Sequence, residues 1–466
     1  MRVVFRVLGA CGLVLLAAGD CFSGDWDRFR GANGQGVSSS STAPETLDPE
    51  KNQVWSVECP TGISSPVVKG DRIFLTGEKG DERLVFCVSA KDGATLWSRS
   101  VTKARDEVAT KPNSASTPTA AIDEERVYAF FPDFGLVAYS LGGEEAWSVP
   151  LGPFSSFHGV SSSPILVGEH VIVLADQLQD SFLAAYDRKT GKEVWKLVRP
   201  DGAIGGYSTP VVRTLPDGER ELIVTGPFDV CGVHPATGKV NWTIEGATNA
   251  PISVPLLLSD HEVVVCEPSF DKNPFPIESL LPLDANKDGK LQLTELEKNI
   301  RLVRIGKRVD ESWGNGDGEI TAEEIDKAFS RFVGGGGLIL IDLNDRSKFK
   351  WSYKKSTPHV PSTLLVDKVL YFILDGGVFN SVDPQTGEIL KKGRIEKGNK
   401  YYASPVAAAG KIYLADIEGN VAVIKAGAEW EVLSVTSLGE PCYATPAIVD
   451  GKVYVRSATR LRCFSP

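Results

Sequence analysis

The sequence predicts an all-β fold, an eight-bladed β-propeller with four-stranded blades and a small α-helical insertion in blade five. Two repeated signals support this prediction, because self-similarity at a fixed period is typical of propellers. The first is a Ser/Thr-Pro element followed, within about ten residues, by an apolar or alternating strand. Its copies are Ser65-Pro66, Thr117-Pro118, Ser163-Pro164, Thr209-Pro210, Val254-Pro255, Ser404-Pro405 and Thr445-Pro446, with Ser362-Thr363 as a degenerate copy. Eight copies predict eight blades.

The second signal is a glycine that stands four residues before a tryptophan. The pairs are Gly93 and Trp97, Gly143 and Trp147, Gly191 and Trp195, and Gly238 and Trp242. We interpret each glycine as the turn of the hairpin that leads into the outer strand of a blade. Blade six has Lys391 where the other blades have tryptophan, so we expect its outer packing to differ.

The spacing of the repeats locates the insertion. The proline landmarks lie 45 to 52 residues apart as far as Pro255, and 41 to 42 residues apart from Thr363 onward. These intervals match the roughly 40–50 residues of a four-stranded blade. Between Pro255 and Thr363 the interval is 108 residues. We therefore place an insertion in blade five, between the predicted strands His261–Cys266 and Gly337–Leu343.

The two ends of the propeller are predicted to share one blade. Val453–Phe464 supplies blade eight only as far as its third strand, whereas Gln53–Val57 is a lone strand before the first repeat. Pairing the two would close the ring and remove exposed strand edges.

The N-terminus is expected to be an export signal. Arg2 and Arg6 precede the apolar run Val7–Ala18, which is shorter than the roughly 20 residues of a membrane span. We predict a signal peptide over 1–20, a leader over 21–52, propeller over 53–267, an insertion over 268–335 and propeller again over 336–466. The protein is then exported, periplasmic or extracellular, with no transmembrane segment in the mature chain. Lipid anchoring at Cys21 is the alternative, which Asp20 disfavours.

Composition narrows the range of partners. The net charge is −10 and no long Lys/Arg run occurs, so the chain lacks the electrostatic signature of nucleic-acid binding. We expect a protein or polysaccharide partner in the cell envelope. Six cysteines follow the leader, and either disulfides or buried thiols are compatible with their spacing.

The insertion contains an EF-hand calcium loop over 284–295. Oxygen ligands fall at the first, third and fifth positions, a glycine at the sixth permits the turn, and a glutamate at the twelfth can grip the ion with both oxygens. The seventh residue offers its carbonyl and the ninth acts through water. The predicted Ca²⁺ ligands are Asp284, Asn286, Asp288, Lys290, Gln292 and Glu295.

A second, weaker loop follows over 313–324, with Asn315, Asp317, Glu319, Thr321 and Glu324 as candidate ligands. Ile320 mirrors Leu291, and these positions form a short β-bridge in paired EF loops. Trp313, however, occupies the first ligand position. Either this loop is a degraded structural partner, or Asp310 reaches in through a rearranged start.

The central channel is the other candidate site. Residues just before each Ser/Thr-Pro element are expected to open onto the propeller axis. His158, Tyr207, Asn249, His359, Tyr402 and Tyr443 lie there. They could form an aromatic, polar pocket for a planar or sugar-like ligand, or fill the channel by packing on one another.

The repeat blocks Tyr186-Asp-Arg-Lys-Thr-Gly-Lys-Glu-Val-Trp195 and Val382-Asp-Pro-Gln-Thr-Gly387 resemble pyrroloquinoline-quinone-like (PQQ-like) propeller repeats. The leader from Trp26 to Gly36 resembles that of exported propellers from planctomycete-type bacteria. The resemblance implies the fold but no single activity. Proteins with these repeats range from quinoprotein dehydrogenases to outer-membrane-assembly lipoproteins.

A quinoprotein dehydrogenase of this type is expected to hold PQQ against a disulfide between adjacent cysteines and beside a channel calcium. No adjacent cysteine pair and no recognisable catalytic motif occurs, so we assign no catalytic residues. We expect a calcium-binding module for binding or assembly; a divergent quinone-dependent alcohol or sugar oxidoreductase is the alternative.

Overall fold

The computed structural model describes residues 25–466 except 157, 201–205, 249, 269–271, 274–275, 331–332 and 334. The predicted signal peptide, Cys21 and Asn249 lie outside the described residues. None of the helices in the described ranges has the length and apolar character required to cross a bilayer.

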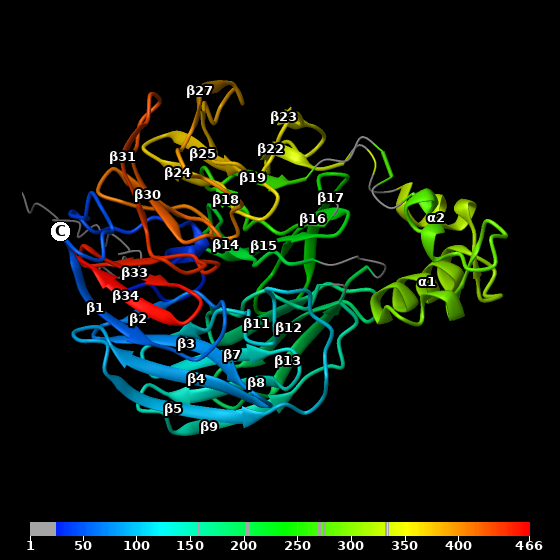
Figure 1. The fold of residues 1–466 in the computed structure, drawn as a ribbon, viewed down its shortest axis with the longest axis horizontal. Helices are drawn as coiled ribbons and strands as arrows, with labels where there is room; N and C mark the ends of the chain where they lie inside the picture. The colour runs from blue at the N-terminus through cyan, green and yellow to red at the C-terminus, as the bar shows by residue number, and fades with distance from the viewer. Residues whose placement is uncertain are drawn as a thin grey trace, which may run out of the picture.

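Eight four-stranded antiparallel sheets surround a central axis, which confirms the predicted eight-bladed propeller (Figure 1). Blades one to four comprise β2 Val67–Lys69, β3 Arg72–Lys79, β4 Glu82–Ser89 and β5 Thr95–Thr102; β6 Ala121–Ile122, β7 Arg126–Phe131, β8 Gly135–Ser140 and β9 Glu145–Pro150; β10 Ile165–Val167, β11 His170–Ala175, β12 Phe182–Asp187 and β13 Glu193–Val198; and β14 Val211–Thr214, β15 Arg220–Gly226, β16 Asp229–Val233 and β17 Val240–Glu245.

Blades five to eight comprise β18 Leu256–Leu257, β19 Glu262–Glu267, β22 Gly337–Asp342 and β23 Phe349–Tyr353; β24 Leu364–Val366, β25 Val369–Leu374, β26 Val378–Val382 and β27 Ile389–Arg394; β28 Val406–Ala408, β29 Lys411–Ala415, β30 Asn420–Lys425 and β31 Glu431–Ser437; and β32 Ala447–Val449, β33 Lys452–Arg456, β34 Arg460–Phe464 and β1 Gln53–Glu58. The middle strands of each blade are almost entirely buried, whereas the outer strands alternate between buried and exposed residues, as expected for stacked sheets.

The ring closes through blade eight as the sequence predicts. Strand β1 pairs antiparallel with β34, so that Gln53 faces Phe464 and Glu58 faces Arg460. One blade therefore contains both ends of the propeller, and β34 presents no free edge to solvent.

The glycine–tryptophan signal marks contacts between neighbouring blades. Gly93 has a φ of 75°, and a Cβ atom on it would lie 2.8 Å from Cε3 of Trp55 in the preceding blade, so only glycine fits. Gly143, Gly191 and Gly238 lie in the same way against Trp97, Trp147 and Trp195. Each of these four indoles also donates a hydrogen bond to a carbonyl of the next blade.

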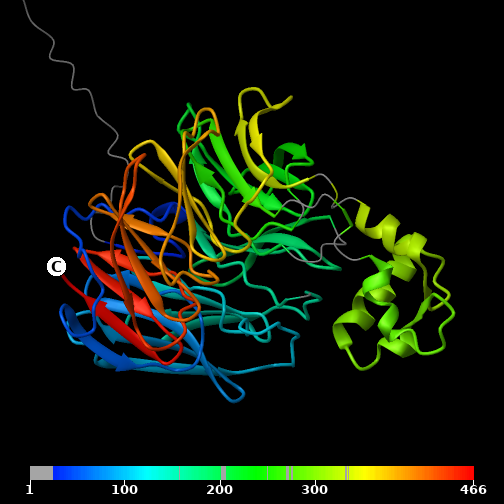
Figure 2. The same cartoon turned by 45° about the horizontal axis from the view of Figure 1, so that its top comes forward.

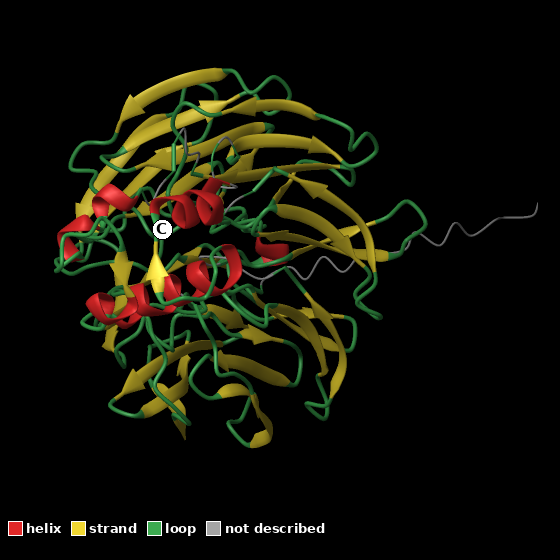
Figure 3. Ribbon diagram, turned by 90° about the vertical axis from the view of Figure 1, so that its right-hand side faces the viewer, coloured by secondary structure: helices red, strands yellow, loops and turns green. Residues whose placement is uncertain are grey.

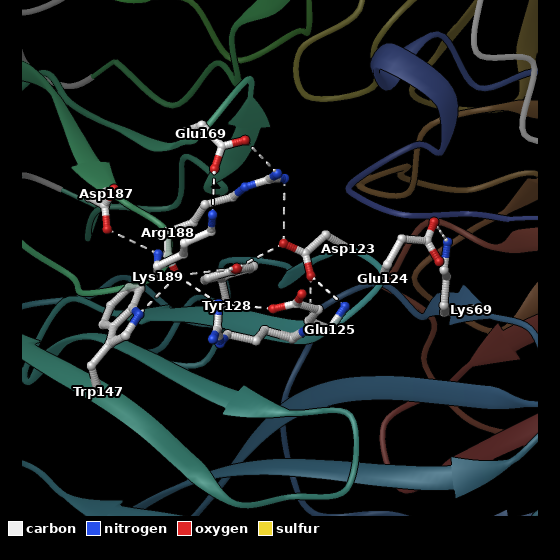
Figure 4. A network of polar contacts seen from close by, with 11 residues as sticks. Lys69, Asp123, Glu124, Glu125, Tyr128, Trp147, Glu169, Asp187, Arg188 and Lys189 are labelled. Atoms are coloured by element: carbon white, nitrogen blue, oxygen red, sulfur yellow. Dashed lines mark hydrogen bonds and ion pairs between the residues drawn. The ribbon is translucent and has the colours of Figure 1, made fainter.

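Figure 4 shows this junction between blades two and three. Trp147 Nε1 donates to the carbonyl of Arg188 at 3.0 Å. The Tyr128 hydroxyl donates to Asp123 at 2.8 Å, and the Arg188 guanidinium lies 3.5 Å from Asp123 and 3.3 Å from Glu169. The tryptophan thus sits at the edge of a polar network that links the two blades.

Blade six is packed differently, as its lysine predicts. Lys391 Nζ donates to the carbonyl of Trp430 at 2.7 Å and lies 4.8 Å from the centre of that indole ring. Trp430 precedes the outer strand of blade seven and also covers Gly393. The lysine therefore donates to the carbonyl of the next blade in place of an indole, and it adds a cation–π contact with Trp430.

A ring of hydrogen bonds joins the inner ends of the blades. In each link, the backbone N–H of one residue donates to the side-chain hydroxyl of the corresponding residue in the next blade, over 2.9 to 3.1 Å. The hydroxyls belong to Ser65, Thr119, Ser163, Thr209, Ser362, Ser404 and Thr445. These seven residues and Val254 form what we call the hydroxyl ring, and all eight are buried.

The hydroxyl ring departs from the sequence pattern at two places. In blade two its member is Thr119, two residues after the Thr117-Pro118 element, because β6 begins at Ala121. In blade five Val254 has no hydroxyl, so the link from Thr209 is missing.

The leader closes one end of the channel. Between residues 26 and 38 it crosses the inner strands and bonds to six blades, including β2, where Trp26 and Val68 exchange backbone hydrogen bonds at 2.9 Å. The buried side chain of Arg28 donates to the carbonyl of Pro210, and that of Arg30 donates to the carbonyl of Thr363. The short 3-10 helix η1, Ala32–Gly34, lies within this crossing.

The insertion leaves blade five between β19 and β22, which remain paired along their whole length from Glu262 to Glu267. Its elements are η2 Ile277–Ser279, η3 Leu281–Leu283, β20 Leu291–Gln292, η4 Leu293–Leu296, α1 Ile300–Trp313, β21 Glu319–Ile320 and α2 Ala322–Phe329. Figures 1 and 2 show it projecting from the propeller on the side away from the C-terminus. It has a core of its own, which includes Leu291, Ile320 and Phe329.

The insertion and the channel entrance share one face of the propeller. Strands alternate in direction within a blade, so the second-to-third connection emerges on the same face as the connection from the fourth strand to the next blade. The insertion occupies the former connection in blade five. Figure 3 looks onto this face and shows the helices in front of the blades. The core of the insertion contacts Phe228 of blade four.

The hydroxyl ring can be tested by adding and removing one link. Val254→Thr should supply the missing acceptor and raise the free energy of unfolding by about 0.5–1.5 kcal/mol, whereas Thr445→Val should leave the Ser404 N–H without a partner and lower it by about 1–3 kcal/mol. Both exchanges conserve side-chain shape. Urea denaturation and calorimetry measure the effects, and equal stability of all three proteins would show that the ring does not stabilise the fold.

Candidate functional site

A cavity of about 360 Å³ occupies the channel. Five of the six channel residues singled out from the sequence line it, namely His158, Tyr207, His359, Tyr402 and Tyr443. Asn249, the sixth, lies outside the described residues. The structure thus gathers side chains from blades that are far apart in sequence into one wall.

The wall is predominantly aromatic near the entrance. The rings of Tyr402 and Tyr443 meet edge to face with centroids 5.8 Å apart, and those of His158 and Tyr207 lie 5.9 Å apart. The Thr110 hydroxyl lies 2.8 Å from His158 Nδ1 and fixes the orientation of the imidazole ring. The rings line the cavity and leave its centre open.

Several further lining residues were not identified from the sequence, and three of them affect the shape and charge of the cavity. Phe29 reaches the cavity from the leader, at the closed end of the channel. Lys111 and Lys400 lie near the entrance, and Lys400 Nζ is 5.1 Å from the centre of the Tyr402 ring. The rule that selected the tyrosines, proximity to the start of a repeat, could have found both lysines. Nothing local in the sequence indicates that the leader returns to the axis.

The charged side chains that line the cavity are basic. None of the described residues that line it is an acid or a cysteine, whereas two lysines and two histidines are present. Burial, followed by the positive charge of Lys400, lowers the pKa of His359 below its ordinary value of 6.5. Burial also raises the pKa of the Tyr207 hydroxyl, which is therefore a neutral donor at pH 7.

The first acidic loop, 284–295, is folded around its own carboxylates. Asp284 Oδ2 accepts from the N–H of Gly289 at 2.9 Å, and Asp288 Oδ1 accepts from the N–H of Lys290 at 2.9 Å. Glu295 Oε1 accepts from Ala285, and its Oε2 accepts from Gln292 at 2.9 Å. Asn286 and Gln292 bond to each other by their side chains at 3.1 Å.

The second acidic loop, 313–324, lies beside the first. Leu291 pairs with Ile320 in the two-stranded sheet β20–β21, as the sequence predicts for paired loops. Asn315 donates to Asp317 at 2.8 Å, the N–H of Thr321 donates to Glu324 at 2.8 Å, and Glu319 forms an ion pair with Lys290. All candidate ligands thus remain on the two loops, about the same short sheet.

The carboxylates are not gathered around a point. Within the described ranges, no cluster of three or more His, Cys, Asp or Glu side chains is arranged to hold a metal ion. In the first acidic loop each acid is instead engaged by N–H groups of its own loop. An ion there would draw on oxygen donors of mixed type, including amides and a backbone carbonyl, and would require these side chains to turn inward.

The six cysteines from Cys59 to Cys463 form no disulfide with one another. Five are buried and Cys59 is half-buried. Burial raises the pKa of Cys442 to about 12, which leaves its thiol protonated and unreactive.

The sequence matches the family model described as outer membrane protein assembly factor BamB over residues 45–156 and 142–265. This match and the eight-bladed fold support a PQQ-like β-propeller. No curated protein sequence matches it. The matched segments cover blades one to four and the start of blade five, and the later blades share the same four-stranded architecture.

Solved structures show the same fold at low sequence identity. BamB from Moraxella catarrhalis aligns with a TM-score of 0.55 and 13% identity, covering 89% of this chain and 97% of that one. A europium-containing methanol dehydrogenase aligns with a TM-score of 0.64 and 10% identity, covering 95% and 98%. The quinohemoprotein alcohol dehydrogenase from Comamonas testosteroni aligns with a TM-score of 0.57 and 11% identity, covering 94% and 80%. At these identities the likeness concerns the fold.

The coupling between Lys400 and His359 is testable. Lys400→Gln should raise the pKa of His359 toward 6.5 without reaching it, because burial is the larger cause of the depression. Since the unfolded chain binds this proton more readily, His359 also lowers the free energy of unfolding as the pH falls below about 6.5. NMR titration measures the pKa, with Lys355→Gln as control. A pKa above 6.5 in the unaltered protein would contradict the assignment.

Proposed function

We propose that this PQQ-like propeller is an exported binding or assembly module of the cell envelope, with calcium bound in its inserted EF-hand pair. The observation that carries the proposal is the shape and charge of the channel. A leader closes one end, and the other end holds lysines, histidines and tyrosines with no acid or cysteine among the described lining residues. This arrangement suits ligand binding.

The cavity favours a small, ring-bearing anion. Its volume falls within the roughly 300–1,000 Å³ of small-molecule sites. Tyr402 and Tyr443 offer ring faces and edges, and Lys111 and Lys400 offer charge-assisted hydrogen bonds to a carboxylate. An acidic sugar unit of an envelope polysaccharide combines these features, because one sugar face can stack on a tyrosine while its carboxylate meets a lysine.

The inserted arm provides the calcium site of the proposal. Asp284, Asn286, Asp288, Gln292 and Glu295 supply side-chain oxygens in EF-hand order, and Lys290 supplies its carbonyl. The hydrogen bond from the Gly289 N–H to Asp284 and the Leu291–Ile320 pairing support the assignment. A hard, oxygen-only donor set of this kind fits Ca²⁺.

The alternative function is a quinone-dependent oxidoreductase. Its support is the structural likeness to the methanol dehydrogenase, which concerns the fold alone. The described cavity lining does not fit the expected arrangement, since it has no acid to hold a calcium beside PQQ and no cysteine to stack on it. We therefore derive no catalytic step. PQQ is itself a planar anion, so it could bind in the cavity under either function. Catalytic turnover therefore distinguishes the two functions, whereas binding of PQQ does not.

The channel proposal is tested with hexuronates and aromatic carboxylates, with the matching hexoses and amides as neutral controls. The acids should bind with a change in tyrosine fluorescence, and Lys400→Gln should weaken them about tenfold or more, because a hydrogen bond to a charged group contributes about 1.5–3 kcal/mol. Lys355→Gln is the exposed control. Equal binding of the acids and their neutral counterparts would overturn the proposal. Dye reduction by alcohols or sugars after addition of PQQ and Ca²⁺ would also overturn it.

The calcium proposal is tested by calorimetry. Glu295→Gln should abolish binding at the first acidic loop, because it removes the charge and one of the two strong oxygens of the bidentate ligand. The exposed neighbour substitution Glu297→Gln should leave binding unchanged. Full retention of all calcium sites in the Glu295→Gln protein would refute the assignment of this loop.

A further inference from the structure

The two acidic loops are equivalent beyond what their sequences suggest. In the first loop the N–H of Asp288 donates to Asn286 at 2.9 Å, and in the second the N–H of Asp317 donates to Asn315 at 3.2 Å. The N–H of Lys290 donates to Asp288 at 2.9 Å, and the N–H of Glu319 likewise donates to Asp317 at 2.8 Å. The twelfth-position glutamates accept the N–H three residues before them in both loops. The second loop therefore has the backbone of a complete loop.

The difference lies at the first position. In the first loop, the central glycine N–H donates to Asp284 Oδ2 at 2.9 Å. In the second, the N–H of Gly318 donates to Asp310 Oδ2 at the same distance, 2.9 Å. Asp310 belongs to the last turn of α1, three residues before Trp313. Its carboxylate makes the contact that a first-position ligand makes.

The helix explains why the ligand is displaced. α1 continues to Trp313, whose side chain packs against the core of the insertion. Residues three apart lie on the same side of a helix, so Asp310 faces the loop from one turn earlier. Gly314 follows, and a Cβ atom there would clash with Glu324 Oε1 and with the backbone carbonyl of Asp310. The missing side chain at Gly314 allows Glu324 to approach the end of α1.

Asp310 also has an unsatisfied oxygen. The residue is 2% exposed, and its Oδ1 is buried without a hydrogen-bond partner among the described residues. A buried carboxylate oxygen without a partner is costly, and such groups are generally paired or bound to a cation. The second loop thus holds a carboxylate that lacks the partner its chemistry requires.

We infer that the second acidic loop is a second calcium site, in which Asp310 of α1 supplies the ligand that Trp313 cannot. The oxygen set is completed by Asn315, Asp317, Glu324 and the backbone carbonyl of Glu319. Thr321 stands at the ninth position, which binds the ion through a water molecule. The site then has three carboxylates, Asp310, Asp317 and Glu324, as the first loop has Asp284, Asp288 and Glu295. This inference rests on the EF-hand assignment in the proposed function and extends it.

The experiment uses the full chain and Ca²⁺ calorimetry. The unaltered protein should bind two ions, and Asp310→Asn should weaken one of them about tenfold or more while the other persists. Asparagine retains an oxygen that can accept the Gly318 N–H, so the loop should remain folded. Glu311→Gln, at the exposed neighbouring residue that pairs with Lys307 at 3.6 Å, is the matched control and should leave both sites unchanged. Glu324→Gln is a second variant that should affect the same site as Asp310→Asn.

Terbium luminescence identifies which loop is affected. Trp313 begins the second loop, so Tb³⁺ bound there should be sensitised by indole excitation in the Glu295→Gln protein, whose first site is disabled. Adding Asp310→Asn or Trp313→Phe should reduce the signal strongly, but only Asp310→Asn should also weaken Tb³⁺ binding. One ion per chain that neither Asp310→Asn nor Glu324→Gln disturbs would overturn this inference and leave the first site standing. No calcium binding by the unaltered protein would overturn the EF-hand assignment itself.

Discussion

The hydroxyl ring is the constraint on which the rest of the molecule depends. At seven of the eight inner strands a backbone N–H reaches the hydroxyl of the next blade, and the last link returns from Thr445 to Ser65. Each link is a directional bond between buried residues, and the seven hydroxyl-bearing members of the ring also line the cavity. Together with the β1–β34 pairing, they fix the number of blades and therefore the width of the channel. The position of every lining residue follows from that geometry.

The leader closes one end of this channel, so the cavity opens at the other end only. A propeller channel is open at both ends unless something covers one of them. Here Arg28 and Arg30 extend from the leader to carbonyls at the inner strands of blades four and six, and Phe29 between them lines the cavity. A ligand of the cavity would then enter from the other face, where Lys111 is exposed.

The insertion stands on that same face, because it extends a second-to-third strand connection. Helix α1 packs near Leu178 of blade three, and the insertion core contacts Phe228 of blade four. Calcium bound at the two loops would fix the ends of α1 and the β20–β21 link, and so the surface that this arm presents beside the cavity entrance. The arm contributes no strand to the propeller, since β19 and β22 pair directly with each other along their whole length.

The sequence by itself determined the number of blades, the shared blade eight, the site of the insertion and five channel residues, because repeat pitch and position within a repeat are local properties. It misplaced the inner-strand landmark of blade two, where Thr117-Pro118 imitates the motif and Thr119 makes the bond. It did not identify Phe29, which lines the cavity from the distant leader, and it left open whether the Asp310 side chain reaches the second acidic loop. Only the tertiary structure decided these points, because the length of α1 is set by packing Trp313 into a core, and the path of the leader is set by carbonyls that come together only when the ring has closed.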